Sequence, residues 1–125
     1  YKTKKKNYFR YRKEIGSFKG YSLLPFRANV RPNYWFYSLY CNESSLIGRD
    51  EIIKRFSAKN IQTRPIWWPI NKLTMYQDSI QYEIVNTDIF WRRIVNIPCS
   101  SNLKNEEIDR VISVFRSMIK EQEYV

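Results

Sequence analysis

The chain contains no histidine, and this absence removes whole classes of chemistry. Ser–His–Asp triads, histidine general bases and most zinc sites need an imidazole. Glycine is also scarce, with three residues in 125, which excludes a glycine-rich phosphate loop. Two cysteines, Cys41 and Cys99, are too few for a disulfide scaffold and are not spaced as a metal knuckle. We therefore expect reduced thiols in a cytoplasmic protein.

Long hydrophobic runs are missing as well. No segment approaches the roughly 20 apolar residues that a membrane-spanning helix needs, and no signal-peptide pattern is present, so we expect no membrane partner. Hydrophobic residues still make up 43% of the chain, enough for the core of one domain. The sequence begins with Tyr1 and not with Met, and we expect it to be a piece of a longer protein.

Positive charge is concentrated at one end of the chain. Residues 1–31 hold ten Lys or Arg and one acidic residue, whereas residues 32–125 hold twelve and eleven. Such a block is typical of a solvated helix face or an exposed terminus. The alternative is a small basic module that binds RNA or DNA, because residues 1–21 also interleave aromatic and cationic side chains.

The hydrophobic spacing predicts an alternation of helices and strands. We expect helices over residues 1–17, 49–58, 78–91 and from about 106 to 119, an extended segment over 21–31, and strands over 33–40, 61–64 and 92–97. This order is typical of an α+β domain, in which helices cover one face of a small, mainly antiparallel sheet.

Several of these elements carry further expectations. Tyr8, Tyr11 and Ile15 form an apolar stripe on the first helix that must pack on this chain or on another domain, and we expect the isolated chain to expose apolar surface and associate. The almost wholly apolar strand 33–40 reads as buried on both faces. Prolines restrict strand 61–64 to an edge or a strand end. Lys104 is a poor helix cap, so Asn102 or Ser101 is expected to cap the last helix.

One segment, residues 63–71 (TRPIWWPIN), points to a binding site. Because successive side chains of an extended chain alternate faces, Trp67 and Trp68 cannot both point inward, and at least one is expected on the surface. Arg64 adds a planar donor that suits phosphate, and an indole face suits a sugar or base ring. From these residues alone, the equal alternative is that one Trp lies in the core while the other covers the sheet edge.

The same segment carries a family resemblance. Residues 60–67 (NIQTRPIW), 96–103 (NIPCSSNL) and 107–112 (EIDRVI) resemble the C-terminal part of the DegT/DnrJ/StrS aminotransferases, most closely the subgroup that acts on 4-keto sugars on the route to legionaminic acid. Residues 33–35 (NYW) look like the first strand of that domain. The Lys-rich opening is similar to the end of the connecting helix.

The resemblance implies a fold, an activity and a set of site residues. The fold would be the C-terminal small domain of a fold-type-I aminotransferase, with residues 1–20 as the end of a connecting helix from an absent N-terminal domain and 21–125 as the small domain. Family members use pyridoxal phosphate to move an amino group from an amino-acid donor to a keto nucleotide sugar, and we expect a homodimer.

The residues of the absent domain would hold the Schiff-base lysine and the cofactor, so this chain alone would supply no catalytic, cofactor or metal residue and would be inactive. Its implied contribution is the substrate pocket, with Trp67 and Trp68 as walls and Asn71 as a hydrogen-bonding contact. Arg64 is a further candidate that alternatively holds the domain together. Many relatives have His at the position of Asn71, and an amide can only hydrogen-bond.

Overall fold

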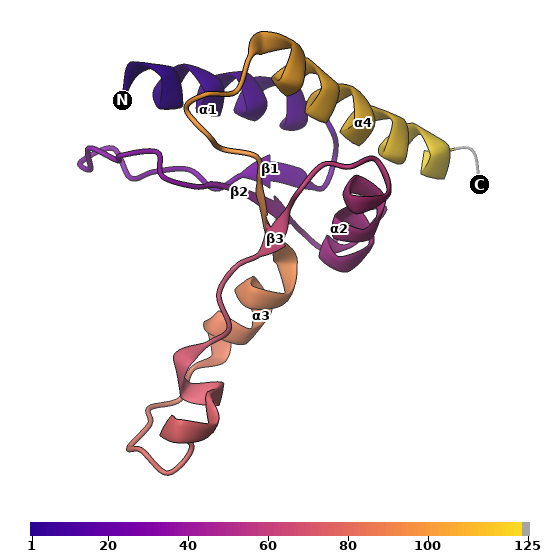
Figure 1. Cartoon of the computed structure of the whole chain (residues 1–125). Coiled ribbons are helices and arrows are strands. Elements are labelled where there is room, and N and C mark those ends of the chain that lie inside the picture. The colour runs from indigo at the N-terminus through magenta and orange to yellow at the C-terminus, as the bar shows by residue number, and fades with distance from the viewer. Residues whose placement is uncertain (124–125) are drawn as a thin grey trace.

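The sheet is the centre of the molecule, which is described by a computed structural model over residues 1–123 (Figure 1). It has four strands in the order β1-β2-β4-β3, and every neighbouring pair is antiparallel. The strands are β1 (Tyr21–Leu23), β2 (Tyr37–Cys41), β3 (Arg64–Pro65) and β4 (Ile94–Ile97). The predicted α+β class with a small antiparallel sheet is confirmed, and β3, which contains Pro65, lies at an edge of the sheet.

Four α-helices complete the fold over the described residues 1–123. They are α1 (Lys2–Ile15), α2 (Arg49–Ala58), α3 (Val85–Arg93) and α4 (Asn105–Glu123), with two short 3₁₀ turns at η1 (Ile70–Lys72) and η2 (Thr74–Tyr76). Helices α1 and α4 lie side by side over one face of the sheet, as Figure 1 shows. Helix α2 packs on α4 and on the β3–β4 edge. No described helix is long and apolar enough to cross a membrane.

The core lies between the sheet and the pair α1–α4. Alternation along β2 turns Tyr37, Leu39 and Cys41 toward the helices and leaves Ser38 and Tyr40 half-buried on the other face. The predicted stripe of α1 is buried in this same core, so its partner surface lies within the chain. The Arg116–Glu14 ion pair at 3.2 Å and the Arg10–Asp109 ion pair join the two helices.

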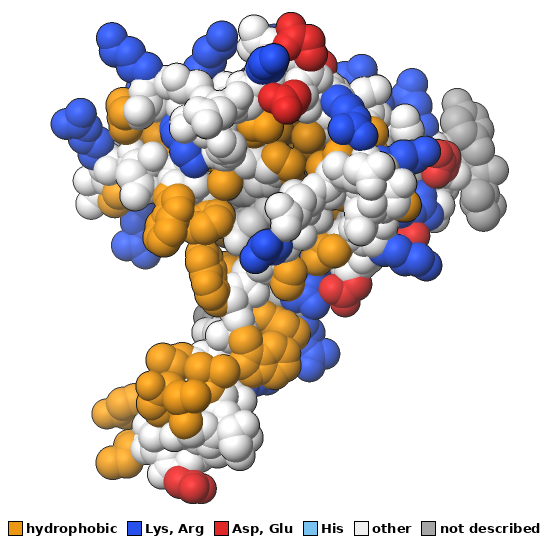
Figure 2. All heavy atoms as spheres, in the orientation of Figure 1, with side chains coloured by type: hydrophobic (Ala, Val, Ile, Leu, Met, Phe, Trp, Pro, Cys, Tyr) orange, Lys and Arg blue, Asp and Glu red, His pale blue; other side chains and the backbone are white. Residues whose placement is uncertain are grey.

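Residues 66–93 form an arm that projects away from the sheet and contains η1, η2 and α3 (Figure 1). A 2.6 Å ion pair between Lys72 and Asp88 joins its two limbs. Most of the large exposed apolar side chains lie on this arm, where Figure 2 shows them gathered; Ile80 is 98% exposed and Tyr82 89%. The expected exposed apolar surface is therefore present, but mainly on the arm, because the apolar stripe of α1 is buried.

The predicted helix over residues 78–91 also lies on the arm, and the prediction is wrong for residues 78–84. The helix begins only at Val85, and residues 77–84 are not helical. Helices in proteins gain most of their stability from packing an amphipathic face, and Ile80 has no surface to pack on. At its other end α3 continues through Arg93, so β4 begins two residues later than the predicted strand.

Two predicted strands are shorter than expected for local reasons. Residues 33–36 lie outside β2, because the Asn33 side chain accepts a hydrogen bond from the Trp35 amide at 3.0 Å and Tyr34 has a φ of 55°. The half-buried second face of β2 also contradicts the expectation of burial on both faces. Residues 61–63 lie outside β3, whose pairing with β4 covers only Arg64 and Pro65.

Candidate functional site

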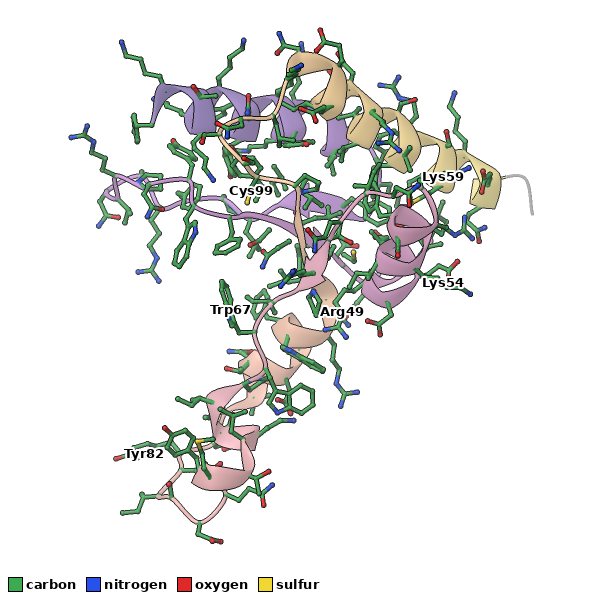
Figure 3. All side chains as sticks on the ribbon, in the orientation of Figure 1. Arg49, Lys54, Lys59, Trp67, Tyr82 and Cys99 are labelled. Atoms are coloured by element: carbon green, nitrogen blue, oxygen red, sulfur yellow. The ribbon has the colours of Figure 1, made fainter. Side chains whose placement is uncertain are left out.

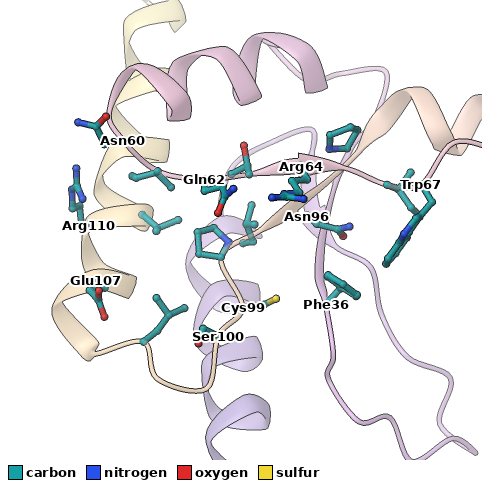
Figure 4. Close-up of a pocket in the computed structure, with 18 of the residues that line it drawn as sticks. Phe36, Asn60, Gln62, Arg64, Trp67, Asn96, Cys99, Ser100, Glu107 and Arg110 are labelled. Atoms are coloured by element: carbon teal, nitrogen blue, oxygen red, sulfur yellow. The ribbon is translucent and has the colours of Figure 1, made fainter.

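A groove of about 880 Å³ opens between the β3 segment and the loop that joins β4 to α4. Its size falls in the range of sites that hold small organic ligands. The two segments pair at Arg64–Asn96 and separate beyond Pro98, where one runs back toward α2 and the other toward α4. Figure 4 shows the polar side chains that converge on the space between them.

One end of the groove is aromatic. Trp67 and Trp68 both line it and are 63% and 50% exposed, so neither indole lies in the core. The alternative of one buried Trp is therefore wrong. The buried residue of this segment is Pro69, which follows the two tryptophans. The Phe36 ring also lines the groove and meets Trp67 edge to face, with centroids 4.9 Å apart.

Polar groups line the middle of the groove. Arg64 is exposed and forms no ion pair with any residue in the range 1–123, so its guanidinium is available to an anion. Beside it Asn96 is buried and accepts a 2.8 Å hydrogen bond from Ser38. The Thr63 hydroxyl is buried without a partner among the described residues. Arginine and amide side chains of this kind can hold phosphate and hydroxyl groups.

The far end of the groove belongs to α4. Glu107 and Arg110 line it, and Arg110 donates a 2.6 Å hydrogen bond to the Lys59 carbonyl at the end of α2. The arginine thus fixes α4 against the segment that leads into β3.

The structure brings three of the four predicted site residues together. Arg64, Trp67 and Trp68 line the groove, whereas Asn71 is half-buried in η1 and is not among the lining residues. Sequence reasoning missed Phe36 and Asn96 as site residues. Asn96 stands in one of the motifs quoted for the family resemblance, and that position was the available signal.

The groove does not fit a covalent pyridoxal phosphate site. Its lining residues, within the described part of the chain, include no lysine to form a Schiff base. Groups of metal-ligating side chains are likewise absent from the residues that were described. Burial raises the pKa of the Cys41 thiol to about 12, so this cysteine stays protonated and is no nucleophile at neutral pH.

The chain's basic first helix is a poor platform for nucleic acid. Tyr8 and Tyr11 are buried in the core, so their rings cannot stack on bases. The alternative of a basic nucleic-acid-binding module is therefore not favoured.

The chain is similar to known proteins over most of its length. The sequence profile described as the DegT/DnrJ/EryC1/StrS aminotransferase family matches residues 1–116. Over 80 residues the chain is 31% identical to GDP-perosamine synthase of Escherichia coli O157:H7, covering 64% of this chain and 21% of that protein. A second GDP-perosamine synthase, from Caulobacter vibrioides, is 24% identical over 86 residues, or 69% of this chain and 23% of that protein.

Solved structures share the fold at low sequence identity. DesI, described in the presence of its TDP-sugar product, superposes with a TM-score of 0.84 at 18% identity, covering 98% of this chain and 32% of that one. PseC of Helicobacter pylori, an aminotransferase of pseudoaminic acid biosynthesis, gives 0.82 at 12% identity over 96% of this chain and 33% of its own. The chain thus spans about a fifth to a third of the length of these proteins.

Proposed function

The chain belongs to the DegT/DnrJ/EryC1/StrS aminotransferase family, and we propose that it is the C-terminal domain of an enzyme that transfers an amino group to a keto sugar carried on a nucleotide. In this proposal residues 1–20 end a connecting helix, and residues 21–125 form the small domain. The amino donor is an amino acid such as glutamate, and the full-length enzyme is a cytoplasmic homodimer.

The observation that carries the proposal is the groove. Three residues assigned to the substrate pocket by resemblance, Arg64, Trp67 and Trp68, line one cavity of ligand size. In the proposed complex the indole rings form the wall against the sugar or base, and Arg64 binds a phosphate oxygen. Asn71 is proposed as a further contact, supplied by the base of the arm.

In the proposed enzyme, pyridoxal phosphate binds outside this chain. The cofactor supplies the electron sink for amino transfer, and the lysine and cofactor-binding groups belong to the part of the enzyme outside this chain. The 125-residue chain alone is expected to show no amino transfer. Its own residues bind and orient the nucleotide sugar.

The motifs and the relatives point to different keto sugars. The motifs TRPIW and NIPCSSNL favour the 4-keto substrates of the legionaminic acid subgroup, whereas two of the curated relatives are GDP-perosamine synthases. A substrate panel therefore needs keto sugars on more than one nucleotide.

Amino transfer by the full-length protein tests the proposal. The protein is incubated with pyridoxal phosphate, glutamate and 4-keto-6-deoxy sugars linked to GDP, TDP or UDP, and 2-oxoglutarate is measured. The proposal predicts 2-oxoglutarate with at least one of these sugars, in an amount equal to the amino sugar formed. A folded, cofactor-loaded protein that transfers to none of them would contradict it.

A further inference from the structure

A stacked arginine lies at the base of the arm, outside the groove. The Arg49 guanidinium lies over the ring of Trp91, 4.5 Å from its centroid, and Nη1 donates a 2.5 Å hydrogen bond to the Trp91 carbonyl. The residue is 8% exposed, although its partner Asp50 is almost fully in solvent. Figure 3 shows Arg49 where the arm leaves the body of the molecule.

Helix stability does not explain this arginine. It is the first residue of α2, and the positive end of a helix dipole disfavours a cation there. At α3 the same guanidinium is well placed. Trp91 lies in the last turn, whose carbonyls lack helical partners and whose dipole end is negative. The guanidinium also pairs with the exposed Asp50 of its own helix at 2.8 Å, but its stacking contact and its bond to a carbonyl are both with α3.

The contact continues from Trp91 to the groove. The rings of Trp91 and Trp68 meet edge to face, with centroids 4.4 Å apart and an interplanar angle of 81°. Trp68 lines the groove but is half-exposed, and it follows a strand of only two residues. Its orientation thus depends on the side chains that contact it.

We propose that Arg49 is a positioning residue that clamps the end of α3 and, through Trp91, holds Trp68 as a fixed wall of the groove. The assignment rests on the proposed function for the part that concerns substrate. The physical link is independent of it: guanidinium on indole, then indole on indole, from α2 to the groove.

The link has a spectroscopic signature. Two indoles in edge contact couple their electronic transitions, which gives a circular dichroism couplet in the far ultraviolet. In the full-length protein this couplet is identified as the component that the Trp91→Phe variant loses. The inference predicts that Arg49→Lys loses most of it, because an ammonium group neither stacks as a plane nor donates the same fork of hydrogen bonds.

Two further variants make the test decisive. Arg49→Met keeps a long side chain without a buried charge and serves if Arg49→Lys does not fold. Arg55→Lys is the matched control, because Arg55 lies on the same helix and pairs with Glu51 and Glu121 but not with the arm. A couplet that survives in folded Arg49→Lys or Arg49→Met would overturn the inference, as would an equal loss in Arg55→Lys.

A binding experiment tests whether the contacts from Arg49 through Trp91 to Trp68 affect the affinity of the groove for its ligand. GDP-mannose, TDP-glucose and UDP-N-acetylglucosamine are titrated calorimetrically into the full-length protein, and the one that binds tightest is the probe. Arg49→Met is expected to raise its Kd roughly three- to tenfold, because a loosened Trp68 ring would have to be ordered when the ligand binds. An unchanged Kd in Trp68→Ala would contradict the role of Trp68 in the proposed function, whereas the couplet would still decide whether Arg49 positions the indole pair.

Discussion

The hydroxyl of Tyr21 in β1 makes two hydrogen bonds with the backbone of Ile47, 26 residues away. It donates to the Ile47 carbonyl at 3.0 Å and accepts from the Ile47 amide at 2.8 Å, and all these groups are buried. One side-chain atom therefore satisfies both backbone groups of a residue in the loop that leads from β2 to α2. This contact ties the first strand to the entrance of α2.

Replacing Tyr21 with Phe is expected to lower the free energy of unfolding of the chain by about 2 kcal/mol, because two buried backbone groups lose their partner. Tyr11→Phe is the matched control. Its hydroxyl is buried with no hydrogen-bond partner among the described residues, so its removal should change stability by less than about 0.5 kcal/mol. Urea unfolding followed by circular dichroism measures both, and equal losses would contradict this assignment.

Alkaline pH should destabilise the chain through its buried tyrosines. Burial raises the pKa of Tyr8, Tyr11, Tyr21 and Tyr37 above the ordinary value of 10.0. The unfolded chain then releases phenol protons at a lower pH than the folded one. The contribution of the buried phenols to the free energy of unfolding is therefore fully present below pH 10, and it is lost as the pH rises toward the folded pKa values. Urea midpoints measured from pH 8 to pH 11 should fall above pH 10, and a flat profile would contradict the burial.

The start of α4 depends on Glu107. Its carboxylate accepts a 2.7 Å hydrogen bond from the Lys104 amide, and the Lys104 carbonyl accepts from Ile108 at 3.2 Å. Lys104 is thus the N-cap and Glu107 supplies half of a capping box, so the expected caps Asn102 and Ser101 are wrong. Glu107→Ala should lower the free energy of unfolding by about 1 kcal/mol, whereas Glu106→Ala should lower it by only a few tenths of a kcal/mol. Thermal unfolding measures both.

The exposed arm predicts self-association of the isolated chain. Apolar surface of this extent is rarely left in water, and Ile80 and Tyr82 at the tip are almost fully exposed. Light scattering should show a concentration-dependent mass that decreases in an Ile80→Ser, Tyr82→Ser double variant. A monomer at all concentrations would contradict this expectation.

Much of the fold follows from hydrophobic spacing. The stripes of α1, α2 and α4 are continuous over several turns, so their spacing alone predicts these helices. The spacing fails where a stripe has no surface to pack on, as at Ile80, and where a local hydrogen bond competes with the strand, as at Asn33. Neither effect is visible in periodicity.

The site was predictable in part. The adjacent tryptophans between two prolines indicate that at least one indole is exposed, and both line the groove. Phe36, which directly precedes β2, and Asn96 of β4 line the same groove, and Arg49 acts on it through Trp91. These contacts join residues far apart in the chain, so they depend on sheet register and on the path of the arm, which residue spacing does not specify.

The central claim is that the groove binds the nucleotide sugar, and one pair of variants tests it most directly. Trp67 and Trp35 are both 63% exposed, and their ring centroids lie 6.3 Å apart, but only Trp67 lines the groove. The account predicts that Trp67→Ala weakens binding of the tightest of the three nucleotide sugars to the full-length protein by about 1 to 3 kcal/mol in calorimetry, the usual worth of one stacked ring. Trp35→Ala should leave that affinity within about twofold, whereas equal effects of the two substitutions, or no effect of either, would contradict the claim.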